Sequence, residues 1–228
     1  MPASHDYGAF LDSLAVRSLD AVRVAERVKH KPELVEALIA GVGSGTACVK
    51  FGASKVLRVL SEQAPELVYP HFDFFVRLLA HESSFLRWNA TLALANLAAV
   101  DRGRKLDRIM DAYLAPISGP NMIDAANVIR GAAAIALAKP YLGDTIAKRI
   151  FRVERATYGT PECRNVALGH AIRALDQLFA ATEDKRGIQL FVSRQTANPR
   201  PATRSKAQRF LQKWPPARPH RSVRRKAA

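Results

Sequence analysis

The segment "FLRWNATLALANL" (residues 85–97) decides the fold, because it is apolar or small on nearly every side and recurs along the chain. A helix that is apolar all round is covered by other helices. Matching segments are "CVKFGASKVLRVL" (48–60), "MIDAANVIRGAAA" (122–134), "CRNVALGHAIRAL" (163–175) and "ATRSKAQRFL" (202–211). We therefore expect the same covered helix in each of five units.

A polar column and a column of small residues run through these five segments at fixed spacing. The polar column consists of Lys50, Arg87, Asp124, Arg164 and Arg204, at steps of 37, 37, 40 and 40 residues. The column three positions later consists of Ala53, Ala90, Asn127, Ala167 and Ala207. A repeat of this length is the mark of a helical solenoid.

One further amphipathic segment precedes each copy, so each unit is predicted to be a helix pair. The expected first helices cover residues 33–42, 65–81, 104–117, 143–157 and 183–196, and residues 7–29 form one long or two short helices before them. Thr160 and Asn198 are each followed by proline, which predicts that they are N-caps of second helices. No run of alternating β-branched residues indicates a strand.

A pair of about 40 residues with a basic and a small residue at fixed places resembles the HEAT-repeat family of α-solenoid proteins. The motif is an apolar residue plus Arg or Lys, followed three residues later by a small one, as in Leu86-Arg87 with Ala90. Thr203-Arg204 with Ala207 repeats it. The resemblance implies an all-α, right-handed α-solenoid of about five HEAT-like helix pairs over residues 33–213. Residues 1–32 would then form an N-terminal capping helix region.

Two interpretations of the polar column stay open. Stacked second helices would bring its members into a ridge able to hold phosphates at regular spacing. Alternatively, the column is an inter-repeat polar ladder in which each member pairs with a neighbouring unit or binds carbonyl groups. Asp124 favours the ladder, because a carboxylate between Arg87 and Arg164 would pair with them and repel a phosphate.

The concave face of the solenoid, lined by second helices, is the expected binding surface. Its candidate residues are Lys55, Arg58, Trp88, Arg130, Arg173 and Arg209. Trp88 is equally well interpreted as a core aromatic residue.

The formal net charge of +15 is concentrated toward the C-terminus. Residues 194–228 contain 11 Lys or Arg and no Asp or Glu, whereas residues 1–193 contain 24 basic and 20 acidic side chains. Residues 214–228, rich in proline and basic groups, are expected to form a disordered basic tail. Such a tail binds polyanions through charge, and its candidate contacts are Arg218, Arg221, Arg224, Arg225 and Lys226.

Catalytic and metal-binding motifs are not found. The six histidines have no spacing that places two metal ligands on one helical face, and Cys163 with His170 makes a poor zinc pair. The glycines of "GVGSGT" (41–46) lack the rest of a phosphate-binding loop. We therefore expect no metal, no small-molecule cofactor and no catalytic residues.

The N-terminus has acidic residues where a signal peptide needs basic ones, and no long apolar run follows, so a cytoplasmic protein without a transmembrane segment is expected. The predicted function is a non-catalytic scaffold that binds a protein or peptide on its solenoid surface. Nucleic-acid binding through the basic C-terminus is the alternative. A third possibility is a HEAT-like alkylpurine DNA glycosylase, a family that uses a carboxylate and aromatic side chains, for which Asp124 and Trp88 would be candidates.

Overall fold

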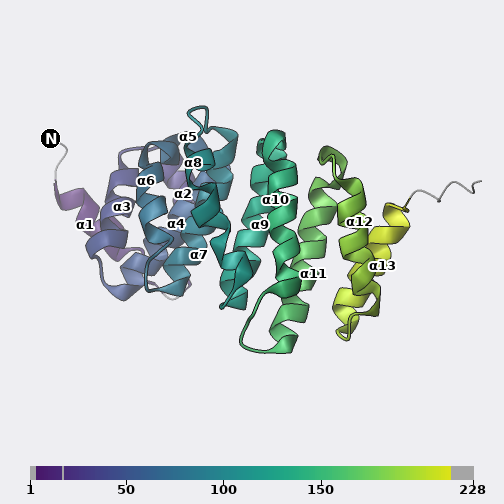
Figure 1. Cartoon of the computed structure of the whole chain (residues 1–228). Helices are drawn as coiled ribbons and strands as arrows, with labels where there is room; N and C mark the ends of the chain where they lie inside the picture. The colour runs from purple at the N-terminus through teal and green to yellow at the C-terminus, as the bar shows by residue number, and fades with distance from the viewer. Residues whose placement is uncertain (1–3, 17, 217–228) are drawn as a thin grey trace, which may run out of the picture.

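The computed structural model describes residues 4–16 and 18–216, and every helix there stands beside the next in one elongated stack (Figure 1). All regular elements in this part of the chain are α-helices or short 3-10 helices. The prediction of an all-α solenoid is confirmed.

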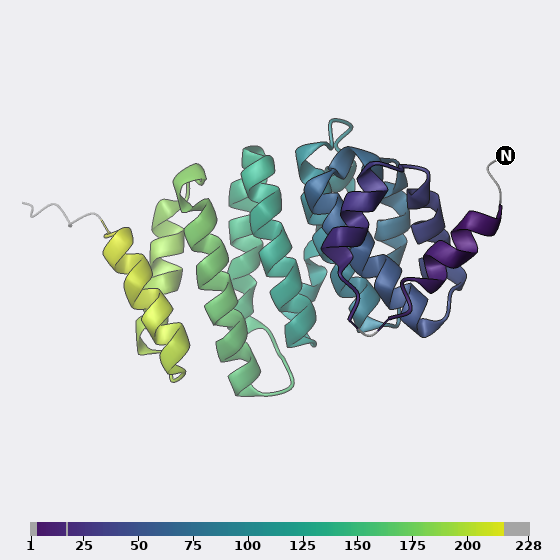
Figure 2. The same ribbon diagram turned by 180° about the vertical axis from the view of Figure 1, so that it is seen from behind.

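The repeated apolar segments form the second helix of each pair. These second helices are α4 (Ala47–Gln63), α7 (Ser84–Asn96), α9 (Met122–Ala138), α11 (Pro161–Leu178) and α13 (Pro201–Lys213). Each one packs against the next along the chain. Figure 2 shows α9, α11 and α13, coloured from teal to yellow, side by side in front of their first helices.

Four of the five first helices have shorter α-helical parts than the sequence predicts, and α3 (Leu34–Ser44) extends two residues beyond its predicted end. The other four are α5 (Pro65–Val68) with α6 (Phe72–Leu78), α8 (Lys105–Leu114), α10 (Gly143–Ile150) and α12 (Lys185–Arg194). The last three continue into 3-10 helices, at Ala115–Ser118, Phe151–Arg155 and Gln195–Ala197. Segment 65–81 is divided by a 3-10 turn, Tyr69–His71, because Pro70 has no N–H for an α-helical hydrogen bond.

The N-terminal segment forms two short helices, α1 (Ser4–Asp12) and α2 (Ala21–Lys29). Asp20 caps α2, since its Oδ1 accepts a hydrogen bond of 3.0 Å from the amide of Arg23. α2 packs against α4, in the place that a preceding second helix would take, and α1 packs against α3. The N-terminal region therefore continues the two rows of the solenoid.

The predicted helix starts differ in outcome. Thr160 caps α11 through a bond of 3.2 Å from the amide of Cys163, as expected. The expected N-cap at Asn198 is wrong, because α13 begins at Pro201 and Arg200 occupies its N-cap position. Asn198 instead accepts from the amide of Arg200 at 3.0 Å and so shapes the turn before the helix.

Small residues let the second helices approach one another. Ala53, Ala90, Ala167 and Ala207 are all at most 1% exposed. α9 departs from this pattern, because Asn127 is half-buried and the close approach occurs one turn later at Gly131. A Cβ atom there would lie 3.1 Å from Cβ of Ala95 on α7 and would overlap the hydroxyl of Tyr113 on α8, which donates to the carbonyl of Thr91.

Candidate functional site

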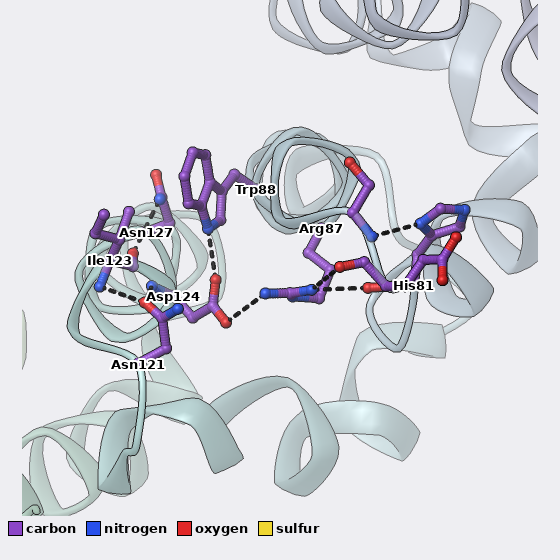
Figure 3. Close-up of polar contacts among 9 residues, drawn as sticks. His81, Arg87, Trp88, Asn121, Ile123, Asp124 and Asn127 are labelled. Carbon is purple, nitrogen blue, oxygen red and sulfur yellow. Dashed lines mark hydrogen bonds and ion pairs between the residues drawn. The ribbon is translucent and has the colours of Figure 1, made fainter. Parts of the chain in front are cut away.

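The polar column contains one direct joint between repeats, made by Arg87 on α7 and Asp124 on α9 (Figure 3). Arg87 donates to Oδ2 of Asp124 at 3.0 Å, and the indole Nε1 of Trp88 donates to Oδ1 at 2.5 Å. The same guanidinium donates to the carbonyls of His81 and Glu82, each at 2.8 Å. Arg87 therefore holds both the turn before its own helix and the start of the next second helix.

The other members of the column do not form a continuous ladder. Arg204 donates to the carbonyl of Asn198 at 2.8 Å, which repeats the turn contact of Arg87. Lys50 is half-buried and Arg164 is exposed, and neither pairs with a carboxylate within the described residues. Asp124 pairs with Arg87 but not with Arg164, so the expectation of one carboxylate shared by both arginines is wrong.

A second inter-repeat joint, buried and absent from the sequence-based predictions, links Asp101 to Lys139. The Lys139 ammonium lies 3.1 Å from Oδ2 of Asp101, and the two side chains are 7% and 0% exposed. Asp101 also accepts bonds from Tyr69 and from the amides that begin α8. Its separation from Lys139 is one repeat length, which is the signal that could have identified the pair.

The contacts within this joint favour the charged forms of Asp101 and Lys139. Burial would raise the pKa of Asp101, but the bonds from Tyr69, from the two amides and from Lys139 lower it below its ordinary value. Burial would lower the pKa of Lys139, but its contacts with Asp101 and Tyr141 raise it. Every group in the cluster has a partner, so the cluster is a structural joint rather than a poised catalytic site.

Four of the six predicted concave-surface residues line hollows on the exposed side of the second helices, which we call the second-helix face. Trp88 instead lies in the joint with Asp124. A hollow of about 200 Å³ is lined by Arg58 on α4, Leu92 on α7, Arg130 on α9 and Gln177 on α11. Four successive second helices share this hollow. Lys55 lies one turn before Arg58 and donates to the carbonyl of Leu19 at 3.3 Å.

Two more hollows continue the second-helix face toward the C-terminus. One, of about 520 Å³, lies between α9 and α11 and includes Asn127, Arg130, His170 and Arg173. The next, of about 360 Å³, lies between α11 and α13. Its lining is formed by Ile172, Arg173, Asp176, Lys206, Arg209, Phe210 and Lys213. Predicted residues Arg58, Arg130, Arg173 and Arg209 therefore lie in one chain of adjoining hollows.

The second helices are strongly basic, and four of their cations lie on α13, within the basic C-terminal part of the chain. Helices α4, α7, α9, α11 and α13 contain eleven Lys or Arg and four Asp or Glu. All four carboxylates are already paired with cations: Glu62 with Arg58, Asp124 with Arg87, Glu162 with Arg200 and Asp176 with Lys213. The remaining cations are therefore not neutralised by the second helices.

Four cations crowd together on α9, α11 and α13: Arg130, Arg173, Lys206 and Arg209, which we call the basic patch. Burial lowers the pKa of Lys206, and the positive charges of Arg173, Arg200 and Arg209 lower it further. Burial lowers the pKa of the neighbouring His170, and the positive charges of Lys206 and Arg173 lower it further. In residues 4–16 and 18–216, no carboxylate forms an ion pair with a member of the basic patch.

The predicted basic tail, residues 214–228, is only partly covered by the structure. Arg218, Arg221, Arg224, Arg225 and Lys226 lie outside the described residues. Trp214, assigned by sequence to the tail, packs on Phe179 with ring centroids 4.8 Å apart and donates to Asp176 at 2.7 Å.

Within the described part, no group of three or more His, Cys, Asp or Glu is placed to hold a metal ion. None of the helices in the described residues combines the length and the apolar character that spanning a membrane requires.

Comparison with solved structures identifies the architecture. The chain is similar to a designed armadillo repeat protein, with a TM-score of 0.61 over 93% of this chain and 94% of that one. The chain has an armadillo-like solenoid fold. Sequence identity is 14%, so the likeness concerns the fold alone. No protein-family model and no curated protein matches the sequence, and the HEAT resemblance is thus supported only as a helical-repeat architecture.

Proposed function

We propose that the protein is a non-catalytic binding scaffold whose second-helix face holds a protein or peptide partner. The observation that carries the proposal is the chain of adjoining hollows, in which α9, α11 and α13 each contribute a cation that has no carboxylate partner on these helices. A solenoid offers an extended surface of this kind without a deep enclosed pocket. Charged groups aligned along it favour an extended, complementary partner.

The paired members of the polar column hold the repeats together rather than face a ligand, which supports placing the binding site on the second-helix face. Arg87 and Asp124 satisfy one another and neighbouring groups, so they serve the stacking of repeats. Both oxygens of Asp124 accept hydrogen bonds, one of them from Trp88, the aromatic residue considered with it for a glycosylase. A carboxylate engaged in this way is poorly placed to act on a base, and for that reason we favour binding over base excision.

A capture experiment tests the scaffold function. The intact protein, a variant with Arg130→Glu and Arg173→Glu, and a matched control with Arg108→Glu and Lys148→Glu are each used as bait in native lysate. Arg108 and Lys148 are exposed on first helices α8 and α10, so the control carries the same charge change on the other row. Specific protein partners should be lost only with the first variant. Equal capture by all three baits would overturn the assignment of this face.

Nuclease treatment tests the alternative in the same experiment. A scaffold for proteins keeps its partners after nuclease digestion. If all captured proteins disappear after digestion, nucleic-acid binding replaces the scaffold as the function. Glycosylase activity in the intact protein that is lost in Asp124→Asn would instead support the enzyme.

A further inference from the structure

The second-helix face is chemically divided into an apolar part and a basic part. The apolar part, which we call the apolar edge, consists of Phe51, Phe85 and Ile123, near the starts of α4, α7 and α9. Their exposed fractions are 40%, 37% and 46%. The rings of Phe51 and Phe85 touch at a centroid distance of 5.2 Å, so two successive repeats form one aromatic surface.

Helical spacing places the apolar edge on the same side as the cations. Phe51 and Arg58 are seven residues apart, as are Ile123 and Arg130, and residues two turns apart share one helix face. Phe85 has the same relation to Leu92, which lines a hollow together with Arg58 and Arg130. A ligand lying along the second-helix face can therefore reach the apolar edge and the basic patch together.

We propose that this face binds an extended acidic peptide segment that also carries large apolar side chains. This inference rests on the proposed scaffold function and specifies its partner. Carboxylates of the segment would lie over the basic patch, and its apolar side chains would pack on the apolar edge. Exposed aromatic residues next to arginine are the composition that characterises the centres of protein–protein interfaces.

The size of the patch also favours a peptide over a nucleic acid. Neighbouring second helices lie about 10 Å apart, so α9 to α13 spans about 20 Å. An extended peptide rises about 3.3 Å per residue and would cross this span with about six residues. Four cations suit the few carboxylates of such a segment, whereas nucleic-acid binding commonly neutralises six or more phosphates.

Fluorescent peptides of about 12 residues, long enough to span the five second helices, test the proposal. One peptide carries glutamates in one half and leucine and phenylalanine in the other, and a second has the two halves exchanged because either direction is possible. In a third peptide serine replaces the apolar residues, and in a fourth glutamine replaces the glutamates. Anisotropy titrations of the full chain compare these four with an oligothymidylate of about 12 nucleotides.

We expect one of the acidic–apolar peptides to bind at least about tenfold more tightly than the serine and glutamine peptides. Arg130→Glu with Arg173→Glu should remove its binding, and Phe51→Ser with Phe85→Ser should weaken it about tenfold. Arg108→Glu with Lys148→Glu should leave it unchanged. Arg130→Gln with Arg173→Gln removes charge without repulsion and should weaken binding as well. Circular dichroism establishes that each variant is folded.

Two results would overturn the proposal. If the oligothymidylate binds as tightly as the best peptide and loses affinity with the same arginine variants, the basic patch is a nucleic-acid site. If no peptide binds, or if the arginine variants bind as well as the intact protein, the acidic partner is wrong. Capture of proteins that depends on Arg130 and Arg173 would still support the scaffold in that case, so the two proposals fail separately.

Discussion

Arg87 and Asp124, 37 residues apart in sequence, form an ion pair of 3.0 Å that joins the second helices of two successive repeats. Both side chains are largely covered, with 23% and 18% of their surface exposed. Trp88 binds the second oxygen of the same carboxylate. The pair therefore fixes how α9 is placed against α7, and through them the shape of the second-helix face.

Asp124→Asn should destabilise the protein by about 1–3 kcal/mol, because it removes the charge that Arg87 pairs with and weakens the bond from Trp88. Urea unfolding followed by circular dichroism measures this change. Asp111→Asn is the matched control, since Asp111 pairs with Arg149 across repeats but is 91% exposed. Equal stability of the two variants would show that the joint does not hold the repeats together.

Lys139→Met should destabilise the protein by about 3–5 kcal/mol, because Asp101 would remain as a buried carboxylate without its cation. If Lys139→Met lowers the free energy of unfolding no more than Lys148→Met on the surface of α10 does, the role of the buried joint is contradicted. Chemical denaturation at neutral pH is the appropriate measurement.

The same joint predicts a pH dependence. The pKa of Asp101 is lower in the folded protein than its ordinary value of 3.8. Its carboxylate therefore contributes stability above that ordinary value, and the contribution is lost as the pH falls through the lower folded value. Below about pH 4 the free energy of unfolding should fall more steeply for the intact protein than for Asp101→Asn. Parallel curves for the two proteins would rule out this contribution.

Gly131→Ala should cost about 1–3 kcal/mol, because the added methyl group would overlap the hydroxyl of Tyr113. Adding Tyr113→Phe should recover part of that loss, since it removes the overlapping atom. Gly43→Ala on α3 has open space around its Cβ and should instead stabilise the helix by about 0.5–1 kcal/mol. Thermal unfolding of these three variants and the intact protein tests the crowding; no recovery in the double variant would disprove it.

Deletion of residues 217–228 should leave the free energy of unfolding unchanged, whereas deletion of 214–228 should lower it. The longer deletion removes Trp214, which covers Phe179 and binds Asp176. The shorter deletion is therefore the correct variant for testing polyanion binding by the C-terminal residues. Unchanged affinity for RNA or DNA after that deletion would remove the model in which the tail binds nucleic acid.

The sequence predicts the helix pairs because the apolar pattern and its period report packing that every repeat must satisfy. It predicts the contact of Arg87 with Asp124 for the same reason, since both belong to one column. Helix ends are less predictable: Asn198 precedes a proline, as a cap often does, but Pro201 offers a second start and α13 uses that one. Local sequence does not distinguish two such starts.

The division of charge between the two rows is the main feature that sequence counts did not show. Within residues 1–193 the second helices contain seven Lys or Arg and four Asp or Glu, and the rest of this segment is nearly balanced. A count over the whole segment therefore does not show on which row the excess lies. Asp101 and Lys139 were missed because each lies in a turn, where polar side chains are ordinarily solvated. Their separation of one repeat becomes informative only after the repeat itself is established.

Site-specific photo-crosslinking tests the central claim, that the second-helix face contacts the partner, most directly. p-Benzoylphenylalanine is placed at Asn127, in the hollow between α9 and α11, or at exposed Arg108 on α8 as the control. After irradiation in native lysate, mass spectrometry identifies the attached segments. We expect crosslinks to acidic peptide segments from position 127 and none of these from position 108. Crosslinks to the same segments from position 108 alone would contradict that claim.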